Sequence, residues 1–121
     1  MKEISEAYAK NCRGNMDFRE LAENLELEEN EFLELVGLFV KTGYSDLNKL
    51  QSAIEDGDTE KVAIVAHSIK GTSANLGLTE IFEFAKRIEM NVRNNDLFGA
   101  TGAAKRIKAE LDRIAKALAK R

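Results

Sequence analysis

Proline and tryptophan are missing from this sequence of 121 residues, and cysteine and histidine each occur once. Cys12 alone cannot form an internal disulfide or a zinc cluster built from several cysteines, and we interpret it as an ordinary surface or half-buried thiol. No apolar run approaches the roughly 18 to 20 residues that a membrane span needs. The first residues, with Glu3 and Glu6, lack the apolar core of a signal peptide. We therefore expect a cytoplasmic protein with no membrane segment.

Basic charge is scarce in the first half of the chain. Residues 1–60 carry 15 acidic and 6 basic side chains, whereas residues 61–121 carry 6 acidic and 12 basic ones. The acidic half argues against nucleic-acid binding, because neutralising phosphates requires a dominant basic surface. The basic residues of the second half alternate with apolar ones at helical spacing, which is typical of solvated helix faces. No nucleic-acid partner is predicted.

Patterns typical of strands are nearly missing, and apolar residues recur instead at helical spacing. The spacing predicts helices over residues 2–12, 17–25, 30–55, 59–76, 80–94 and 98–119. Asp17, Asp58 and Thr79 are the predicted N-caps, and Gly57 and Gly77 are suited to the turns. The predicted buried stripe of the long helix consists of Phe32, Leu35, Val36, Phe39, Leu47, Leu50 and Ile54.

Short turns between successive helices force them to lie antiparallel. The predicted fold is therefore all-α, an antiparallel up-down four-helix bundle with a short extra N-terminal helix. Residues 1–15 are assigned to an N-terminal extension with a helical pattern, and residues 16–121 to one domain, a length sufficient for a single core. We expect a monomer.

His67, the single histidine, falls on the face of its predicted helix opposite Val62, Ala66 and Ile69, so its ring is expected to face water. Gly71 lies one turn further on the same face. A glycine inside a helix costs roughly 1 kcal/mol relative to alanine, and here it leaves room for another protein to approach the ring. Close helix packing is the alternative explanation for a glycine at such a position.

Lys70 flanks the same ring, where its ammonium can neutralise the oxygens of a phosphoryl group. Glu89 is brought to the level of His67 if the two helices that flank the turn near residue 78 are antiparallel. A carboxylate there can accept the Nδ1 proton of the ring and leave Nε2 free as a nucleophile. The alternative, an ordinary exposed glutamate, has equal weight on the sequence alone.

The stretch from His67 to Ser73 (HSIKGTS), followed by Asn75, Leu76 and Gly77, closely resembles the His-x-x-Lys-Gly-x-Ser-x-x-x-Gly motif of histidine-containing phosphotransfer (HPt) domains. The resemblance covers roughly residues 17–118. It implies a four-helix bundle in which His67 takes a phosphoryl group from the phospho-aspartate of one receiver domain and delivers it to another. It also implies that the receiver holds the Mg²⁺, so that this domain needs no metal or cofactor of its own.

The implied partners are the receiver domains of response regulators and a hybrid sensor histidine kinase. The predicted docking residues are apolar or small and surround the histidine: Ala63, Ile64, Ala74, Phe18, Leu21 and Leu38. No ATP-binding catalytic domain is expected, so the chain is predicted to be a carrier and not an enzyme.

Two alternatives remain open. The chain can be the phospho-accepting module for a chemotaxis-type histidine kinase, since members of the family in those kinases carry glutamate at the position of Glu89. It can also be an adaptor that binds receivers without transferring phosphate, although His67, Lys70 and Gly71 together argue against this. A metal enzyme or a nucleophilic hydrolase finds little support, because no second histidine and no Gly-x-Ser-x-Gly motif is present.

Overall fold

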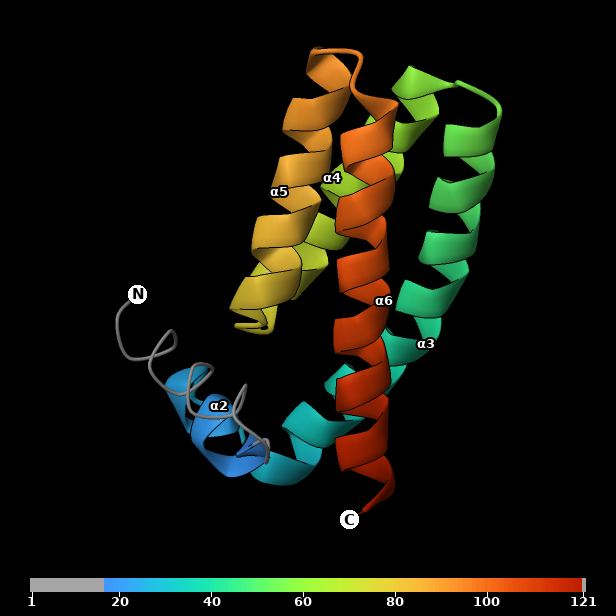
Figure 1. The fold of residues 1–121 in the computed structure, drawn as a ribbon. Helices are drawn as coiled ribbons and strands as arrows, with labels where there is room; N and C mark the ends of the chain where they lie inside the picture. The colour runs from blue at the N-terminus through green and yellow to red at the C-terminus, as the bar shows by residue number, and fades with distance from the viewer. Residues whose placement is uncertain (1–16, 121) are drawn as a thin grey trace.

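The computed structural model describes residues 17–120, which form five helices and no strand. The helices are α2 (Phe18–Asn24), α3 (Glu29–Glu55), α4 (Thr59–Asn75), α5 (Thr79–Arg93) and α6 (Leu97–Ala119). The four longer helices run up and down beside one another, and short turns join them (Figure 1). The predicted all-α bundle with a short extra N-terminal helix is confirmed. The helix predicted over residues 2–12, and Cys12, lie outside the described residues, and the domain boundary at residues 15 and 16 stays a prediction.

The four long helices begin and end within one residue of their predicted limits. Asp17 and Asp58 are N-caps as predicted, and their carboxylates accept hydrogen bonds from the amides of Glu20 at 3.0 Å and Lys61 at 3.1 Å. The N-cap predicted at Thr79 is wrong. Helix α5 begins at Thr79 itself, and its N-cap is Leu78, which is fully buried and contributes to the core instead of capping with its side chain.

The turns after α3 and α4 use glycine in the left-handed region, as predicted. Gly57 has a φ of 69° and Gly77 a φ of 72°, values that side chains with a Cβ rarely adopt. These two tight turns reverse the chain and so place α4 antiparallel to both α3 and α5.

One continuous core fills the bundle. Helices α3 and α5 each border α4 and α6, so that the four helices enclose a common interior. Its largest fully buried side chains include Leu50, Ile69, Ile81, Ile88, Ile107, Leu111 and Ile114. Ser73 is also buried, and its hydroxyl donates to the carbonyl of Ile69 at 2.7 Å, which satisfies it inside its own helix. No helix in residues 17–120 is long and apolar enough to cross a membrane.

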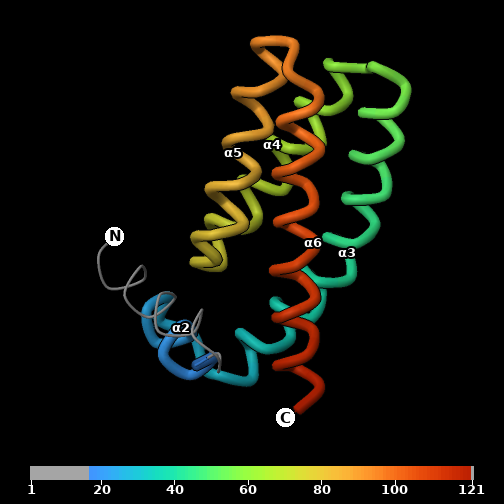
Figure 2. Tube along the Cα trace, in the orientation of Figure 1, coloured from blue at the N-terminus to red at the C-terminus, as the bar shows by residue number. Residues whose placement is uncertain are grey.

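Helix α2 lies across the end of the bundle where α3 begins and α4 ends (Figure 2). Phe18 and Leu21 point into the core and expose only 2% and 1% of their surface, and the rings of Phe18 and Phe32 have centroids 6.4 Å apart. The prediction that Phe18 and Leu21 belong to a docking surface is therefore wrong. A short helix must bury its few large apolar side chains to be held in place.

Leu35 departs from the predicted buried stripe of α3, because 44% of its surface is exposed. Val36 and Phe39 beside it are buried as expected. The first turns of α3 lie near α2, at the edge of the bundle, where fewer helices of the described residues 17–120 are present to cover the stripe (Figure 1).

Candidate functional site

His67 lies midway along α4 and projects from the bundle. Its side chain is 72% exposed, while Ala66 and Ile69 on the opposite side of the helix are buried. The apolar period of α4 produces this arrangement, because Val62, Ala66, Ile69 and Ser73 all turn inward and leave the position of His67 outside. The predicted exposure of the ring is confirmed.

Glu89 on α5 reaches the His67 ring from the neighbouring helix. The distance from Nδ1 of His67 to Oε2 of Glu89 is 3.2 Å. An ionised carboxylate only accepts hydrogen bonds, so this contact requires the proton on Nδ1 and, in the neutral ring, leaves the lone pair on Nε2. The contact predicted from the antiparallel hairpin of α4 and α5 is therefore present.

Lys70 binds the other oxygen of the same carboxylate. Its Nζ lies 2.7 Å from Oε1 of Glu89, and the two side chains are 28% and 15% exposed. The sequence reasoning placed Lys70 beside His67 but missed this ion pair. The signal was available, because a carboxylate level with His67 is also within reach of a long side chain three residues further along the same helix face.

The ionisation of Glu89 reflects two opposing influences. Partial burial acts to raise its pKa, but the hydrogen bonds from Lys70 and His67, together with their charges, outweigh burial and hold the pKa below its ordinary value. Glu89 is therefore a carboxylate at neutral pH. The Glu89 carboxylate thus bridges His67 and Lys70. This bridge fixes the orientation of the His67 ring and holds the Lys70 ammonium near it.

Gly71 provides open space one turn beyond His67. It is exposed, and a Cβ built at this position meets no atom within 4 Å other than those of its own helix. The glycine is therefore not needed for helix packing, which removes the alternative explanation considered from the sequence. Ala74, three residues after Gly71, is also exposed, so only small side chains project from the helix on this side of the ring.

The remaining predicted docking residues are placed in different ways. Ile64 is 64% exposed on α4, one turn before His67, and Leu38 is 60% exposed on α3. Ala63 is partly buried and packs against the core. These three, unlike Phe18 and Leu21, present at least part of their surface to solvent. In residues 17–120 no group of three His, Cys, Asp or Glu side chains is arranged to bind a metal ion.

Comparison with protein families gives one match. The model described as Hpt domain matches residues 34–117, more than half of the chain, and this range includes His67, Lys70, Gly71 and Glu89. The chain belongs to the Hpt domain family. No curated protein and no solved structure matches the sequence. An Hpt domain is a histidine phosphotransfer module of two-component signalling that interacts with receiver domains and kinases, and it is not itself a catalytic kinase domain.

Proposed function

We propose that this Hpt domain is an intermediate carrier in a multistep phosphorelay. His67 accepts a phosphoryl group from the phospho-aspartate of one receiver domain and delivers it to the aspartate of a second. The observation that carries the proposal is the exposed ring of His67, whose Nδ1 lies 3.2 Å from Oε2 of Glu89. A carrier of this kind needs an accessible nucleophile of fixed tautomer.

The transfer step follows from this geometry. The lone pair of Nε2 attacks the phosphorus of the acyl phosphate, the N–P bond forms, and the P–O bond to the aspartate breaks and releases a carboxylate. Nδ1 keeps its proton, so the phosphorylated ring gains a positive charge. The carboxylate of Glu89, at 3.2 Å from Nδ1, stabilises that charge. Delivery to the second receiver is the same step in reverse.

Lys70 and Gly71 assist in different ways. Lys70 lies three residues after His67 on α4, and its ammonium binds Oε1 of Glu89 at 2.7 Å. The flexible side chain lets that ammonium turn from Glu89 toward the phosphoryl oxygens on His67. Gly71 lets the active site of the receiver approach without a steric barrier. We propose that the Mg²⁺ for the reaction is bound by the receiver and not by this chain.

The docking surface in this proposal is formed by Ile64, Ala74 and Leu38, with the exposed part of Ala63. Its partners are the receiver domains of response regulators and a hybrid sensor histidine kinase, and we expect the exchange to take place in the cytoplasm. Exposed apolar residues around a polar reacting group suit a transient interface of this kind.

Phosphotransfer profiling tests the proposal. Receiver domains phosphorylated with a ³²P label are mixed with the chain, and label is expected to appear on it within the mixing time and then to pass to a second receiver. The variant His67→Gln must remain unlabelled while keeping the helical circular dichroism of the parent. Equal labelling of parent and His67→Gln, or no labelling by any receiver from the source organism, would show that the proposal is wrong.

Glu89 favours one second candidate function, the phospho-accepting module of a chemotaxis-type histidine kinase. Members of the Hpt family that belong to such kinases carry glutamate at this position. The same assay separates the two functions by donor. Labelling by a chemotaxis kinase core with ATP, without labelling by phosphorylated receivers, supports the second candidate.

A further inference from the structure

Helix α5 carries a lysine beside the His67 site that has no part in the transfer step described above. Lys86 lies three residues before Glu89, and its side chain is exposed. Side chains three residues apart project from the same side of a helix, one turn from each other. Glu89 contacts His67 and Lys70 across the interface of α4 and α5, so this side of α5 borders α4. Lys86 is therefore at the rim of the site.

The level of Lys86 along the bundle follows from the antiparallel run of α4 and α5. His67 and Glu89 are level, because their side chains are in contact. Three residues from Glu89 toward the turn that joins the two helices correspond to about three residues from His67 toward the same turn. Lys86 is thus level with Lys70 and close to Gly71, where the surface is open. A partner that approaches over Gly71 meets Lys86 at the edge of the contact.

The charges of the site itself cancel. Glu89 is ionised, and the ammonium of Lys70 at 2.7 Å offsets its negative charge, while the neutral ring of His67 adds none. Lys86, in contrast, forms an ion pair with no acidic side chain of residues 17–120, although Glu83 lies three residues before it. Its positive charge is therefore available to an anionic group on another protein.

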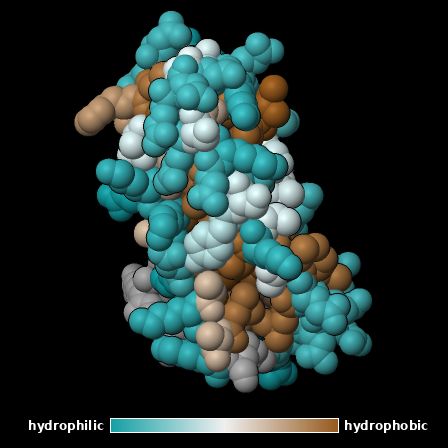
Figure 3. Space-filling model, turned by 90° about the vertical axis from the view of Figure 1, so that its right-hand side faces the viewer, coloured by the Kyte–Doolittle hydropathy of each residue, from teal (hydrophilic) through white to brown (hydrophobic). Residues whose placement is uncertain are grey.

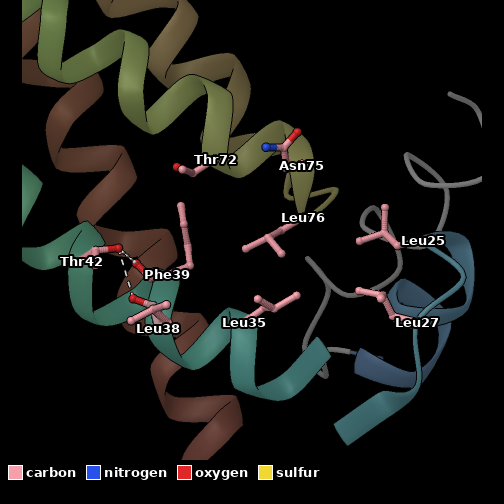
Figure 4. A pocket seen from close by; sticks show the side chains of 9 residues that line it. All are labelled: Leu25, Leu27, Leu35, Leu38, Phe39, Thr42, Thr72, Asn75 and Leu76. Carbon is pink, nitrogen blue, oxygen red and sulfur yellow. Dashed lines mark hydrogen bonds between the residues drawn. The ribbon is translucent and has the colours of Figure 1, made fainter. Parts of the chain in front are cut away.

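The apolar part of the surface near His67 lies on the other side of α4, toward α3. A pocket there is lined by the apolar side chains of Leu25, Leu27, Leu35, Leu38, Phe39 and Leu76 (Figure 4). Within residues 17–120, none of the residues that line it lies on α5. Apolar side chains also gather in the lower half of the face drawn in Figure 3. Protein interfaces combine an apolar centre with a polar rim, and α5 supplies charge on the side where the pocket does not extend.

We propose that Lys86 is a docking residue that binds an acidic side chain at the rim of the receiver's active site. This inference rests on the proposed function, in which the donor is a receiver domain that holds Mg²⁺. Proteins bind Mg²⁺ through carboxylates, and the phosphoryl group adds further negative charge, so the partner surface that faces His67 is anionic. A receiver without a carboxylate opposite Lys86 loses this attraction, so Lys86 contributes to the choice of partner.

Rapid-quench measurement of ³²P transfer to the full chain, over a range of concentrations of a phosphorylated receiver, tests the proposal. Lys86→Gln removes the charge without adding a carboxylate that would compete with Glu89 for Lys70. The receiver concentration that gives the half-maximal rate is expected to rise roughly 2-fold to 5-fold at about 0.1 M salt, the effect of one exposed ion pair. The maximal rate must stay within about twofold of the parent, because docking and not the chemical step is changed.

Two control variants and a change of salt accompany this measurement. Lys86→Arg keeps the charge and must not weaken docking. Lys105→Gln removes the same charge from an exposed position on α6, diagonally across the bundle from α4, and must behave as the parent. At about 1 M salt the screening length falls to about 3 Å, so the difference between Lys86→Gln and the parent is expected to disappear.

A double-mutant cycle identifies the carboxylate on the receiver. Exposed Asp and Glu residues around its phospho-aspartate, apart from those that hold Mg²⁺, are replaced one at a time by the corresponding amide. Against one of these receiver variants, Lys86→Gln is expected to cause no further rise in the half-saturating concentration, because the ion pair is already lost.

Four results overturn the proposal. The first is an unchanged half-saturating concentration for Lys86→Gln, and the second is an equal rise for Lys105→Gln, which would be an effect of net charge alone. The third is a maximal rate lowered by more than about twofold, since Lys86 then acts on the phosphoryl group. The fourth is an undiminished effect of Lys86→Gln against every receiver variant. The proposed function fails by a different result, the absence of label on the parent chain with any receiver.

Discussion

Replacing Glu89 by glutamine removes one negative charge beside His67 and keeps the length of the side chain. The amide oxygen can still accept the Nδ1 proton at about the present 3.2 Å, but it no longer balances the charge of Lys70, whose Nζ lies 2.7 Å from Oε1 in the parent. The variant therefore separates the orientation of the ring from the electrostatic stabilisation of the phosphorylated ring.

The magnitude follows from the geometry. A hydrogen bond to a charged group is stronger than a neutral one by about 1 kcal/mol. The loss of the attraction between the cationic ring and the carboxylate adds up to about 1 kcal/mol in this half-solvated setting, because Lys70 already neutralises part of the charge. A barrier higher by about 1 to 2 kcal/mol slows transfer to His67 by roughly 5-fold to 30-fold.

Rapid-quench measurement of ³²P transfer from a phosphorylated receiver gives this rate. Glu110→Gln is the matched control, because Glu110 on α6 is 14% exposed and pairs with Arg113 at 3.2 Å, much as Glu89 is 15% exposed and pairs with Lys70. The control must transfer at the parental rate. A rate for Glu89→Gln within twofold of the parent would refute the electrostatic role assigned to Glu89.

Three further predictions concern other parts of the fold. Gly71→Ala is expected to raise the free energy of unfolding by about 1 kcal/mol in urea titrations, because the new Cβ meets no neighbour. The same substitution is expected to slow phosphoryl transfer, because the methyl group narrows the approach to His67. An unchanged transfer rate contradicts the access role of Gly71. Asp58→Ala removes the N-cap of α4 and is expected to cost about 1 kcal/mol of stability without changing the transfer rate of the folded protein. The hydrogen bond from the Tyr44 hydroxyl to Asp112, at 2.6 Å, raises the pKa of Tyr44 from 10.0 to about 12. Its contribution to stability is therefore complete below about pH 10 and is lost as the pH rises through about 12. Ultraviolet titration of a Tyr8→Phe variant follows the Tyr44 phenol alone, and titration near pH 10 would contradict this.

Much of the fold was accessible from the sequence because helical period and turn chemistry are local properties. The limits of the long helices and the left-handed glycines at Gly57 and Gly77 depend only on nearby residues. The contact between His67 and Glu89 was also predictable, since a tight turn between two antiparallel helices fixes which residues are level.

What the sequence could not provide is the covering of each helix face by distant parts of the chain. The burial of Phe18 and Leu21 depends on how α2 crosses the end of the bundle, and a helix of seven residues has no long stripe to reveal it. The exposure of Leu35 depends on where the neighbouring helices end. The hydrogen bond between Tyr44 and Asp112 joins residues 68 positions apart in the sequence. At that separation the spacing of residues does not predict which side chains meet.

The four residues assigned to phosphoryl chemistry all lie on the α4–α5 hairpin, within residues 59–93. Leu35 and Leu38 lie on α3, and Leu25 and Leu27, which line the same pocket, lie in the connection between α2 and α3. Of the docking residues in the proposed function, Leu38 is therefore encoded by a separate stretch of sequence, whereas Ala63, Ile64 and Ala74 lie on α4 with His67. On the proposed docking surface, a substitution at Leu38 is expected to change partner preference while the reactivity of His67 is preserved.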